Sequence, residues 1–331
     1  MSKTCLLAPA VILWDLLEYY GKDPEPVFCQ EGITREMILQ NNALISQTVK
    51  DNLWLRVSQM IEDRCFGLKA GGLWHPSYLN ALGYAWLASA TLREALERLK
   101  RYLHFISNIA VLHLQETTEG FAACLNFNPV SIYIPARTDL FFAILISMCR
   151  VNYGHTLNPV SVHFKHEAPS CSSEFFSYFK SPVTFGAEKN CLILPMDKID
   201  IPLKGYNPEI ARIHDQIIIR YLADINKDDI VERTKGAIVK LLPSGKVSDE
   251  KVAGELFLSV RSLQRNLQKR NTTFGQLMDR VRQELANEYV RDRNISLTEV
   301  AFILGFSEQS VFSKAFKRWT GRTPSDVRKA A

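Results

Sequence analysis

The most constraining feature of this sequence is a tight turn between two short amphipathic helices near its C-terminal end. Residues 296–319 predict one helix, a corner at Gly305 and a second helix whose N-cap is Ser307. Glycine adopts the positive φ of such a corner without a Cβ clash, and serine is a favoured N-cap. Ala301 is small at the point where the two helices would cross. We therefore predict a helix-turn-helix unit.

The second helix of this unit has one face for packing and one face for recognition. At helical spacing, the packing face contains Phe312, Ala315, Phe316 and Trp319. The opposite face and its flanks contain Gln309, Ser310, Ser313, Lys314 and Lys317. Glutamine matches adenine, a basic side chain matches guanine or phosphate, and serine matches either base. This face therefore suits the major groove of DNA.

A similar pattern occupies residues 249–270, where Ser259 is the expected N-cap of a second recognition helix. Apolar side chains mark its packing side: Val252, Ala253, Leu256, Leu263 and Leu267. The outward side and its flanks contain Arg261, Ser262, Gln264, Arg265 and Gln268. Either unit alone is a weak signal, because most charged helix faces are merely solvated. Two units in one basic segment indicate a DNA-binding function.

The spacing of the two units also suits a DNA duplex. The two predicted caps, Ser259 and Ser307, are 48 residues apart. Residues 273–292 between them predict a helix of about twenty residues, which spans roughly 30 Å. Successive major-groove faces lie about 34 Å apart. One chain is thus expected to place both recognition helices on the same side of the duplex.

The net charge separates the chain into two parts. Residues 231–331 contain 19 Lys and Arg against 11 Asp and Glu, a net of +8, and the remainder contains 21 against 24, a net of −3. A length of 331 residues favours two domains. The imbalance predicts that only the C-terminal domain meets a polyanion. It argues against a nucleic-acid packaging protein, which needs basic residues throughout.

The N-terminal part predicts an α+β domain with a small, mostly antiparallel sheet. Its first hundred residues have helical periodicity and end in a helix that Thr91 and Glu94 start as a capping box. Later segments predict a hairpin, further strands and two helices. The hairpin strands are 109–115 and 121–128, the further strands 158–166, 181–186 and 190–195, and the helices 138–152 and 172–180.

Asn207 and Pro208 predict the start of a helix that extends to residue 225. Its wide apolar stripe is compatible with packing on its own domain or with pairing of two subunits. The polar stretch 226–233 follows, so we predict a sensor and dimerisation domain at 1–225 and a DNA-binding domain at 226–331. The second is expected to be all-α, with two helix-turn-helix motifs joined by a long helix.

The seven scattered cysteines form no C-x-x-C pair, which favours reduced thiols in a cytosol. Oxidant sensing by a single cysteine is an alternative, but buried inert thiols are commoner. His163, His166 and Cys171 do not suit zinc, because residues three apart on a strand point to opposite faces. We therefore expect no metal and no cofactor.

Enzyme and membrane classes find no support in the sequence. It contains no nucleophile elbow, phosphate loop, zinc helix or dinucleotide fingerprint. No stretch approaches the ~20 apolar residues of a membrane span. Asp15 and Glu18 follow the apolar N-terminal run where a signal peptide would be cleaved, so we expect an amphipathic first helix and a cytoplasmic protein.

The C-terminal segment 305–328 resembles the DNA-binding domain of AraC/XylS-family regulators. The matching residues are Gly305, Phe306, Phe312, Phe316, Gly321, Pro324 and Arg328, with 258–267 matching the first recognition helix. Residues 62–71, 91–102 and 166–203 are similar to the arabinose-binding-type sensor domain of one branch of that family. Phe257 departs from the family's Gly, His or Asn in the first corner, and would be strained at positive φ. Asn271 replaces a common glycine but tolerates that conformation.

This resemblance implies a bacterial homodimeric transcription regulator that occupies promoter DNA. It implies base contacts by Arg261, Gln264 and Arg265 in the first unit and by Gln309, Ser310 and Lys314 in the second. Activation through contact with RNA polymerase is what the family implies, although repression is equally compatible with the sequence. The sensor domain implies a small-molecule effector or a partner. The effector, the operator and the regulated genes stay open at this stage.

Overall fold

The computed structural model describes residues 4–40, 43–127, 132–225, 229–245, 247–292 and 295–330. Its internal contacts divide the chain into two compact units, Met1–Ala211 and Arg212–Ala331. Helix α10 (Pro208–Ile225) spans this division. The sequence predicts the boundary between 225 and 226 instead, and that boundary stays a prediction because residues 226–228 lie outside the described part of the chain.

The N-terminal unit begins with a two-stranded antiparallel sheet of β1 (Thr4–Leu6) and β2 (Leu44–Ser46). Before Val11, one segment pairs as strand β1 and the next forms a short 3-10 turn. The expected first helix therefore begins only at Val11. The helices of this part are α1 (Val11–Tyr19), α2 (Glu25–Gln30), α3 (Arg35–Leu39), α4 (Gln47–Met60), α5 (Phe66–Leu73), α6 (Ala81–Leu87) and α7 (Leu92–Ile106), with 3-10 turns η1 (Ala8–Ala10) and η2 (Pro76–Leu79).

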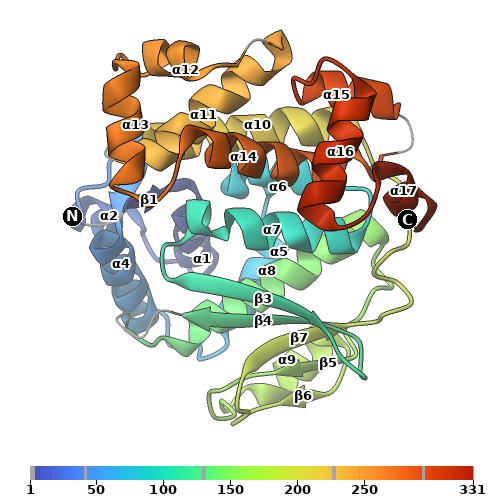
Figure 1. Ribbon diagram of the computed structural model, residues 1–331. Helices are drawn as coiled ribbons and strands as arrows, with labels where there is room; N and C mark the ends of the chain where they lie inside the picture. The colour runs from blue at the N-terminus through green and yellow to red at the C-terminus, as the bar shows by residue number, and fades with distance from the viewer. Residues whose placement is uncertain are drawn as a thin grey trace. The chain divides into compact units, whose positions relative to one another are not determined.

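The main sheet has five described strands in the order β3-β4-β7-β5-β6. They are β3 (Ala110–Glu116), β4 (Phe121–Phe127), β5 (Ser161–His163), β6 (Val183–Thr184) and β7 (Asn190–Leu194). Every described neighbouring pair is antiparallel except β5 and β6. The predicted hairpin is confirmed, with Ala110 opposite Phe127 and Glu116 opposite Phe121. Figure 1 shows this sheet below α7 and α8 (Pro135–Tyr153), which confirms the α+β class.

Helix α7 has the strongest sequence signal of this unit, and its N-terminus is close to the prediction. Thr91 Oγ1 accepts a hydrogen bond from Glu94 N at 3.1 Å. Glu94 Oε2 accepts from Ala90 N at 3.2 Å, one residue before the predicted partner. The capping box is therefore only half formed. The apolar stripe of this helix is buried at Leu92, Ala95, Leu96, Leu99, Leu103 and Ile106.

Aromatic rings and one buried ion pair fix α8, α9 (Ser172–Phe179) and β5 together. Phe164 lies with its ring centroid 5.6 Å from that of Phe142 and 5.2 Å from that of Phe175. His166 Nε2 lies 2.9 Å from the buried carboxylate of Asp139. These contacts give His166 a structural role in the sensor unit.

The prediction of reduced thiols is wrong for four of the seven cysteines. The structure bonds Cys65 to Cys171 and Cys124 to Cys191, at sequence separations of 106 and 67. Cys124 and Cys191 stand directly opposite each other on β4 and β7, a proximity that only the strand register creates. The three free cysteines are Cys5 and Cys149, which are buried, and Cys29, which is exposed.

The described residues of the C-terminal unit form helices and the turns between them, with no strand among them. Beyond α10 it contains α11 (Ile230–Leu241), η3 (Leu242–Ser244), α12 (Asp249–Glu255), α13 (Val260–Gln268), α14 (Phe274–Tyr289), α15 (Leu297–Ile303), α16 (Gln309–Thr320) and α17 (Pro324–Ala330). The polar stretch expected to link the domains is partly helical, because Asp229 caps α11 by accepting from Val231 N at 2.9 Å. Helix α11 packs against α14, and both pack on the helix-turn-helix units.

Candidate nucleic-acid interface

Two helix-turn-helix units are present, α12 with α13 and α15 with α16. Their first helices start at serine N-caps. Ser248 Oγ accepts from Lys251 N at 3.4 Å, and Ser296 forms a reciprocal capping box with Glu299. Local sequence thus starts both first helices, because each cap satisfies backbone N–H groups that have no partner in the helix.

The corners between the helices differ in residue type and in length. Phe257 and Gly305 follow the C-caps of α12 and α15, with φ values of 57° and 71°. Phe257 is 95% exposed, so the expected strained conformation is present without burial of its ring. A Cβ on Gly305 would lie 3.2 Å from the carbonyl oxygen of Leu242, so glycine suits both the φ and the space.

The second corner is one residue longer than the first. Helix α13 has Ser259 as its N-cap, with Ser259 Oγ accepting from Ser262 N at 3.2 Å. Helix α16 has Glu308 as its N-cap and no side-chain cap bond there, so the predicted cap at Ser307 is wrong. Because of this extra residue, equivalent positions of α13 and α16 lie 49 residues apart in the sequence. Buried Leu263 of α13 thus corresponds to buried Phe312 of α16.

Each corner is held by an arginine from the helix that precedes its unit. Arg282 of α14 donates from Nε to Leu304 O and from Nη2 to Gly305 O, both at 2.9 Å. Its guanidinium carbon lies 4.3 Å from the centroid of the Phe306 ring. Arg233 of α11 donates from Nη2 to Leu256 O at 3.2 Å. The C-terminal unit therefore contains a repeat of one supporting helix plus one helix-turn-helix unit.

The predicted recognition face of α13 is available at the surface. Leu263 and Leu267 are buried, whereas Arg261, Gln264 and Arg265 are exposed and Ser262 is half-buried. Gln264 Nε2 donates to Asp249 Oδ2 at 3.0 Å, and Ser262 Oγ accepts from Ser259 Oγ at 3.1 Å. The two polar residues are therefore already engaged within the unit.

Helix α16 has the same organisation. Phe312 and Phe316 are buried, and the predicted recognition residues are exposed or half-buried at Gln309, Ser310, Ser313, Lys314 and Lys317. Gln309 Oε1 accepts from Thr298 Oγ1 at 2.7 Å, and Ser310 Oγ donates to Glu308 Oε2 at 3.1 Å. The two helices therefore present similar polar faces.

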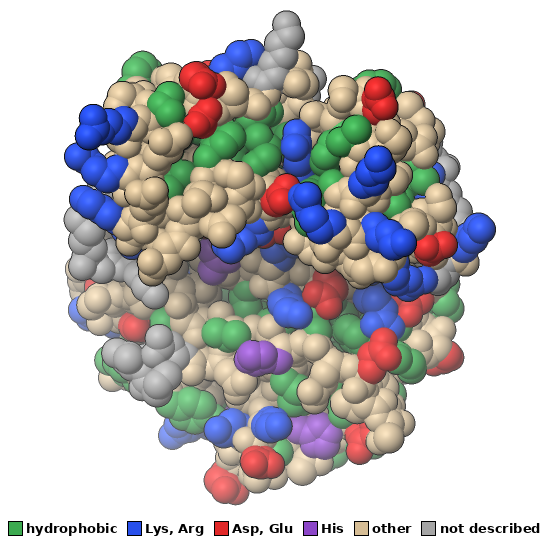
Figure 2. Space-filling model, in the orientation of Figure 1, with side chains coloured by type: hydrophobic (Ala, Val, Ile, Leu, Met, Phe, Trp, Pro, Cys, Tyr) green, Lys and Arg blue, Asp and Glu red, His purple; other side chains and the backbone are tan. Residues whose placement is uncertain are grey.

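The basic members of both faces are electrostatically unpaired. Across the described part of the chain, no ion-pair partner lies within 4.0 Å of Arg261, Arg265, Lys314 or Lys317. Figure 2 shows Lys and Arg side chains gathered on the face that presents α13 and α16. Uncompensated cations on two recognition helices attract phosphate and suit base edges.

The connecting helix is shorter than the sequence predicts. Helix α14 has 16 residues, which corresponds to about 24 Å rather than the expected 30 Å. Its apolar stripe is buried at Leu277, Met278, Val281, Leu285, Ala286 and Tyr289, and Phe274 is half-buried. The N-caps by themselves give no indication of the supporting arginines. Comparison of the two halves at an offset of 49 residues aligns Arg233 with Arg282.

Two basic helix-turn-helix units on one helical frame define the class as a helix-turn-helix DNA-binding protein. Residues 252–330 match the model of a helix-turn-helix domain. Residues 21–203 match the model described as the arabinose-binding domain of AraC transcription regulator, N-terminal. The chain therefore belongs to the AraC family of transcription regulators, and its function is regulation of transcription rather than enzymatic catalysis.

The similarity to known proteins extends over nearly the whole chain. The ornithine utilization regulator of Pseudomonas aeruginosa is 27% identical over 327 residues, which cover 98% of this chain and 96% of that protein. The HTH-type transcriptional regulator VirS of Mycobacterium tuberculosis is 26% identical over 329 residues, with coverage of 97% and 96%. The crystal structure of the transcriptional regulator CdpR from Pseudomonas aeruginosa has a TM-score of 0.48 and 20% identity, and covers 96% of this chain and 98% of that chain.

Within the described residues, no helix is long and apolar enough to cross a membrane.

Proposed function

We propose that this protein is a sequence-specific, promoter-binding activator in the bacterial cytoplasm, controlled through its N-terminal unit. The observation that carries the proposal is the pair of exposed, unpaired cationic faces on α13 and α16, each held on a corner supported by an arginine. Phosphate contacts supply affinity that is independent of sequence, and base-edge contacts supply specificity. A major groove admits one α-helix, so both helices would enter successive grooves.

The proposed base-contacting residues fall into two groups. Arg261, Arg265, Lys314 and Lys317 require no rearrangement, because they have no ion-pair partner among the described residues. The polar members are Ser262, Gln264, Gln309, Ser310 and Ser313. Gln264 and Gln309 must give up the hydrogen bonds to Asp249 and Thr298 before they contact a base. We infer that the cations contribute more of the affinity and that the glutamines contribute discrimination.

Binding by full-length protein to a site selected from genomic fragments tests this proposal. Arg265→Ala and Lys314→Ala are each expected to weaken specific binding by about 1 to 3 kcal/mol. Lys240→Ala is the matched control, because Lys240 is exposed but paired with Glu255 at 2.6 Å. Affinity should fall steeply with added salt. Equal losses on selected and random DNA would assign the residue to phosphate contact, and a flat salt response would contradict the proposal.

We also propose that the regulator is a homodimer paired through its N-terminal unit and α10. Helix α10 buries Ala211 and Ile218 but leaves Ile210 and Ile213 43% and 41% exposed. An exposed apolar pair on one helix supports the pairing alternative. Sedimentation of the full chain should show a dimer that Ile210→Glu with Ile213→Glu dissociates. Val151→Glu, on a residue 57% exposed in α8, is the control that should stay dimeric.

Activation through RNA polymerase contact is the finer part of the proposal. It rests on the family resemblance, and its test is transcription in vitro from a selected promoter with purified polymerase. An increase in transcript with the regulator supports activation. A decrease would assign the protein to repression by promoter occlusion, with the same DNA interface.

A further inference from the structure

An apolar cavity lies within the N-terminal unit, enclosed chiefly by α4, α7 and α8. Its volume is about 120 Å³. That volume is below the roughly 300–1,000 Å³ of most ligand pockets, so only a small ligand suits it. Its apolar wall includes Trp54, Leu99, Leu103, Phe141, Ile144 and Met148. The cavity therefore has room for a small organic molecule with an apolar body.

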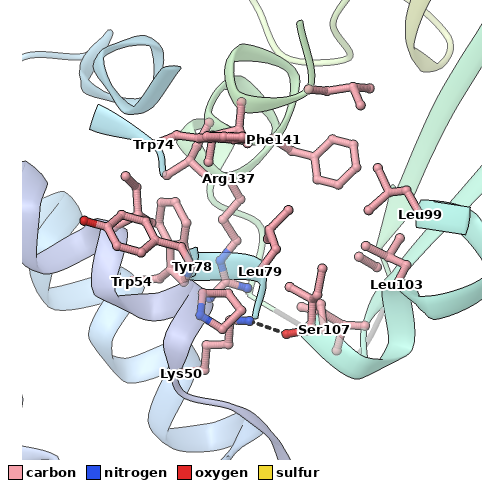
Figure 3. A pocket seen from close by; sticks show the side chains of 18 of the residues that line it. Lys50, Trp54, Trp74, Tyr78, Leu79, Leu99, Leu103, Ser107, Arg137 and Phe141 are labelled. Atoms are coloured by element: carbon pink, nitrogen blue, oxygen red, sulfur yellow. Dashed lines mark hydrogen bonds between the residues drawn. The ribbon is translucent and has the colours of Figure 1, made fainter. Parts of the chain in front are cut away.

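Two buried cations lie at one end of this apolar space, as Figure 3 shows for Lys50 and Arg137. The Lys50 residue is 8% exposed, and its Nζ donates to the carbonyl of Ile106 at 2.8 Å. The Arg137 side chain is 6% exposed, and its guanidinium carbon lies 5.5 Å from the centroid of the Trp54 ring. Burial lowers the pKa of both groups, since water no longer stabilises their charge.

The charge of these cations is only partly balanced. Arg137 Nη2 lies 2.7 Å from Asp51 Oδ1 and forms an ion pair with it. No Asp or Glu is among the described residues that line the cavity. When Lys50 is protonated, the side chains of Lys50, Arg137 and Asp51 together leave one positive charge in excess. A buried charge without a partner is costly, so an anionic ligand would be stabilised at this position.

Unsatisfied hydrogen-bonding atoms line the same cavity. Arg137 Nε and Nη1 have no hydrogen-bond partner in the described structure, and neither does the buried Trp74 Nε1. These three N–H groups are donors, and Gln47 Oε1 on the same lining is an acceptor that also has no partner. Buried donors are almost always paired in native proteins, so their orphaned state here indicates an acceptor that a ligand supplies.

We propose that this cavity binds an organic monocarboxylate with an alkyl or aryl body, and that such a compound is the effector. The guanidinium fork of Arg137 matches a carboxylate, and Lys50 adds a point charge. One excess positive charge suits a monoanion better than a phosphate, whose charge near neutral pH approaches −2. The apolar body lies along the wall of Trp54, Leu99 and Phe141. This inference rests on the proposed control through the N-terminal unit and names its ligand class and site.

A ligand series on the full-length wild-type protein tests the charge preference without any substitution. Octanoate, octan-1-ol and octylammonium share one alkyl body and differ in the charge of the head. Isothermal titration should show octanoate binding at least tenfold more tightly than octan-1-ol, and no measurable binding of octylammonium. 4-Phenylbutanoate in place of octanoate distinguishes an aryl from an alkyl body. Equal affinity for octanoate and octan-1-ol would overturn the proposal.

Substitutions then identify the residue that causes the preference for octanoate over octan-1-ol. Arg137→Met should remove the preference for octanoate over octan-1-ol while octan-1-ol still binds, because the apolar wall is kept. Arg56→Met is the matched control, since Arg56 is on α4 and pairs with Glu31 at 2.8 Å outside the cavity lining. It should keep the preference. An unchanged preference in Arg137→Met would place the anion elsewhere and overturn the site.

The effector role is tested separately from the site. Affinity of the wild-type protein for its selected DNA site should change at least threefold when octanoate is added at saturation, and should stay constant in octan-1-ol at equal concentration. Tight octanoate binding without any change in DNA affinity would refute the effector role alone. Absence of specific DNA binding at any ligand concentration would instead refute the proposed function.

Discussion

Arg282 is the side chain whose loss should most clearly separate the two helix-turn-helix units. Replacement by methionine keeps an apolar stem but removes the guanidinium that donates to Leu304 O and Gly305 O and lies over the Phe306 ring. Leu304 is fully buried, so its carbonyl has little access to replacement water. The expected effect is local destabilisation of α15 and α16.

The size of this effect follows from the contacts. Two hydrogen bonds from a charged donor in a half-buried position contribute about 1 kcal/mol each. The cation–π contact adds about 0.5–1 kcal/mol. The expected loss is thus about 2.5–3 kcal/mol, or roughly 70- to 160-fold in a local opening equilibrium. Arg233→Met, which removes a single bond of 3.2 Å, should cost only about 1 kcal/mol.

Hydrogen exchange of the full-length variants, followed by mass spectrometry of peptides, measures both effects in place. Arg282→Met should accelerate exchange in residues 297–320 and leave 249–268 unchanged. Arg233→Met should produce the smaller, reciprocal pattern. Equal acceleration of both segments by either variant, or no acceleration at all, would refute the assignment of one supporting arginine to each corner.

Three further outcomes are expected. Gly305→Ala should lower the free energy of unfolding by about 1–2 kcal/mol in urea denaturation, because alanine is strained at a φ of 71°. The loss should exceed that of Gly245→Ala, since Gly245 has a φ of 65° but no atom within 4 Å of an added Cβ. Equal losses would exclude an effect of the Leu242 carbonyl on position 305. Without reductant, Ellman's reagent should titrate only Cys29 in the native state and three thiols in denaturant, whereas seven would refute both disulfides. Burial opposes charge on His166, but Asp139 outweighs it and raises the pKa. The charged imidazolium of His166 therefore contributes its full stabilisation below about pH 6.5, the pKa in the unfolded chain. The stabilisation is lost as the pH rises through the higher pKa of the folded state. Burial also raises the pKa of Asp139, so its carboxyl group contributes to the same slope. Denaturation from pH 5.5 to 9 should show this slope in wild type and lose it when His166→Gln and Asp139→Asn are combined.

The helix-turn-helix units were predictable because their information is local. Caps such as Ser259 and Ser296 lie within three residues of the groups they satisfy, and the apolar face repeats within one helix. The cap of α16 was missed for a related reason. Ser307 has better N-cap propensity than Glu308, but the longer second corner starts the helix one residue later. The N-cap propensity of a single residue does not indicate how long the corner before the helix is.

The effector cavity and the disulfides could not be predicted, since they depend on contacts between distant segments. Lys50 lies 56 residues from the carbonyl that it contacts, and nothing in its surroundings in the sequence indicates burial. Cys124 and Cys191 become neighbours only through the order β4-β7, which places non-consecutive strands side by side. The sequence indicated that a hairpin and further strands exist, but it contained no pairing order for them.

The two recognition helices are supported to different degrees, and this asymmetry bears on how they bind. The second corner combines glycine at positive φ with three guanidinium contacts, so α16 is held in place before DNA arrives. The first corner combines one long arginine bond with an exposed Phe257 at φ 57°, a conformation that costs about 1–2 kcal/mol in an L-residue. A pre-ordered helix loses less entropy on binding. We therefore expect α16 to supply a rigid contact, while α13, whose Arg261 and Arg265 can form bidentate bonds to guanine, adapts to the base sequence at a larger ordering cost.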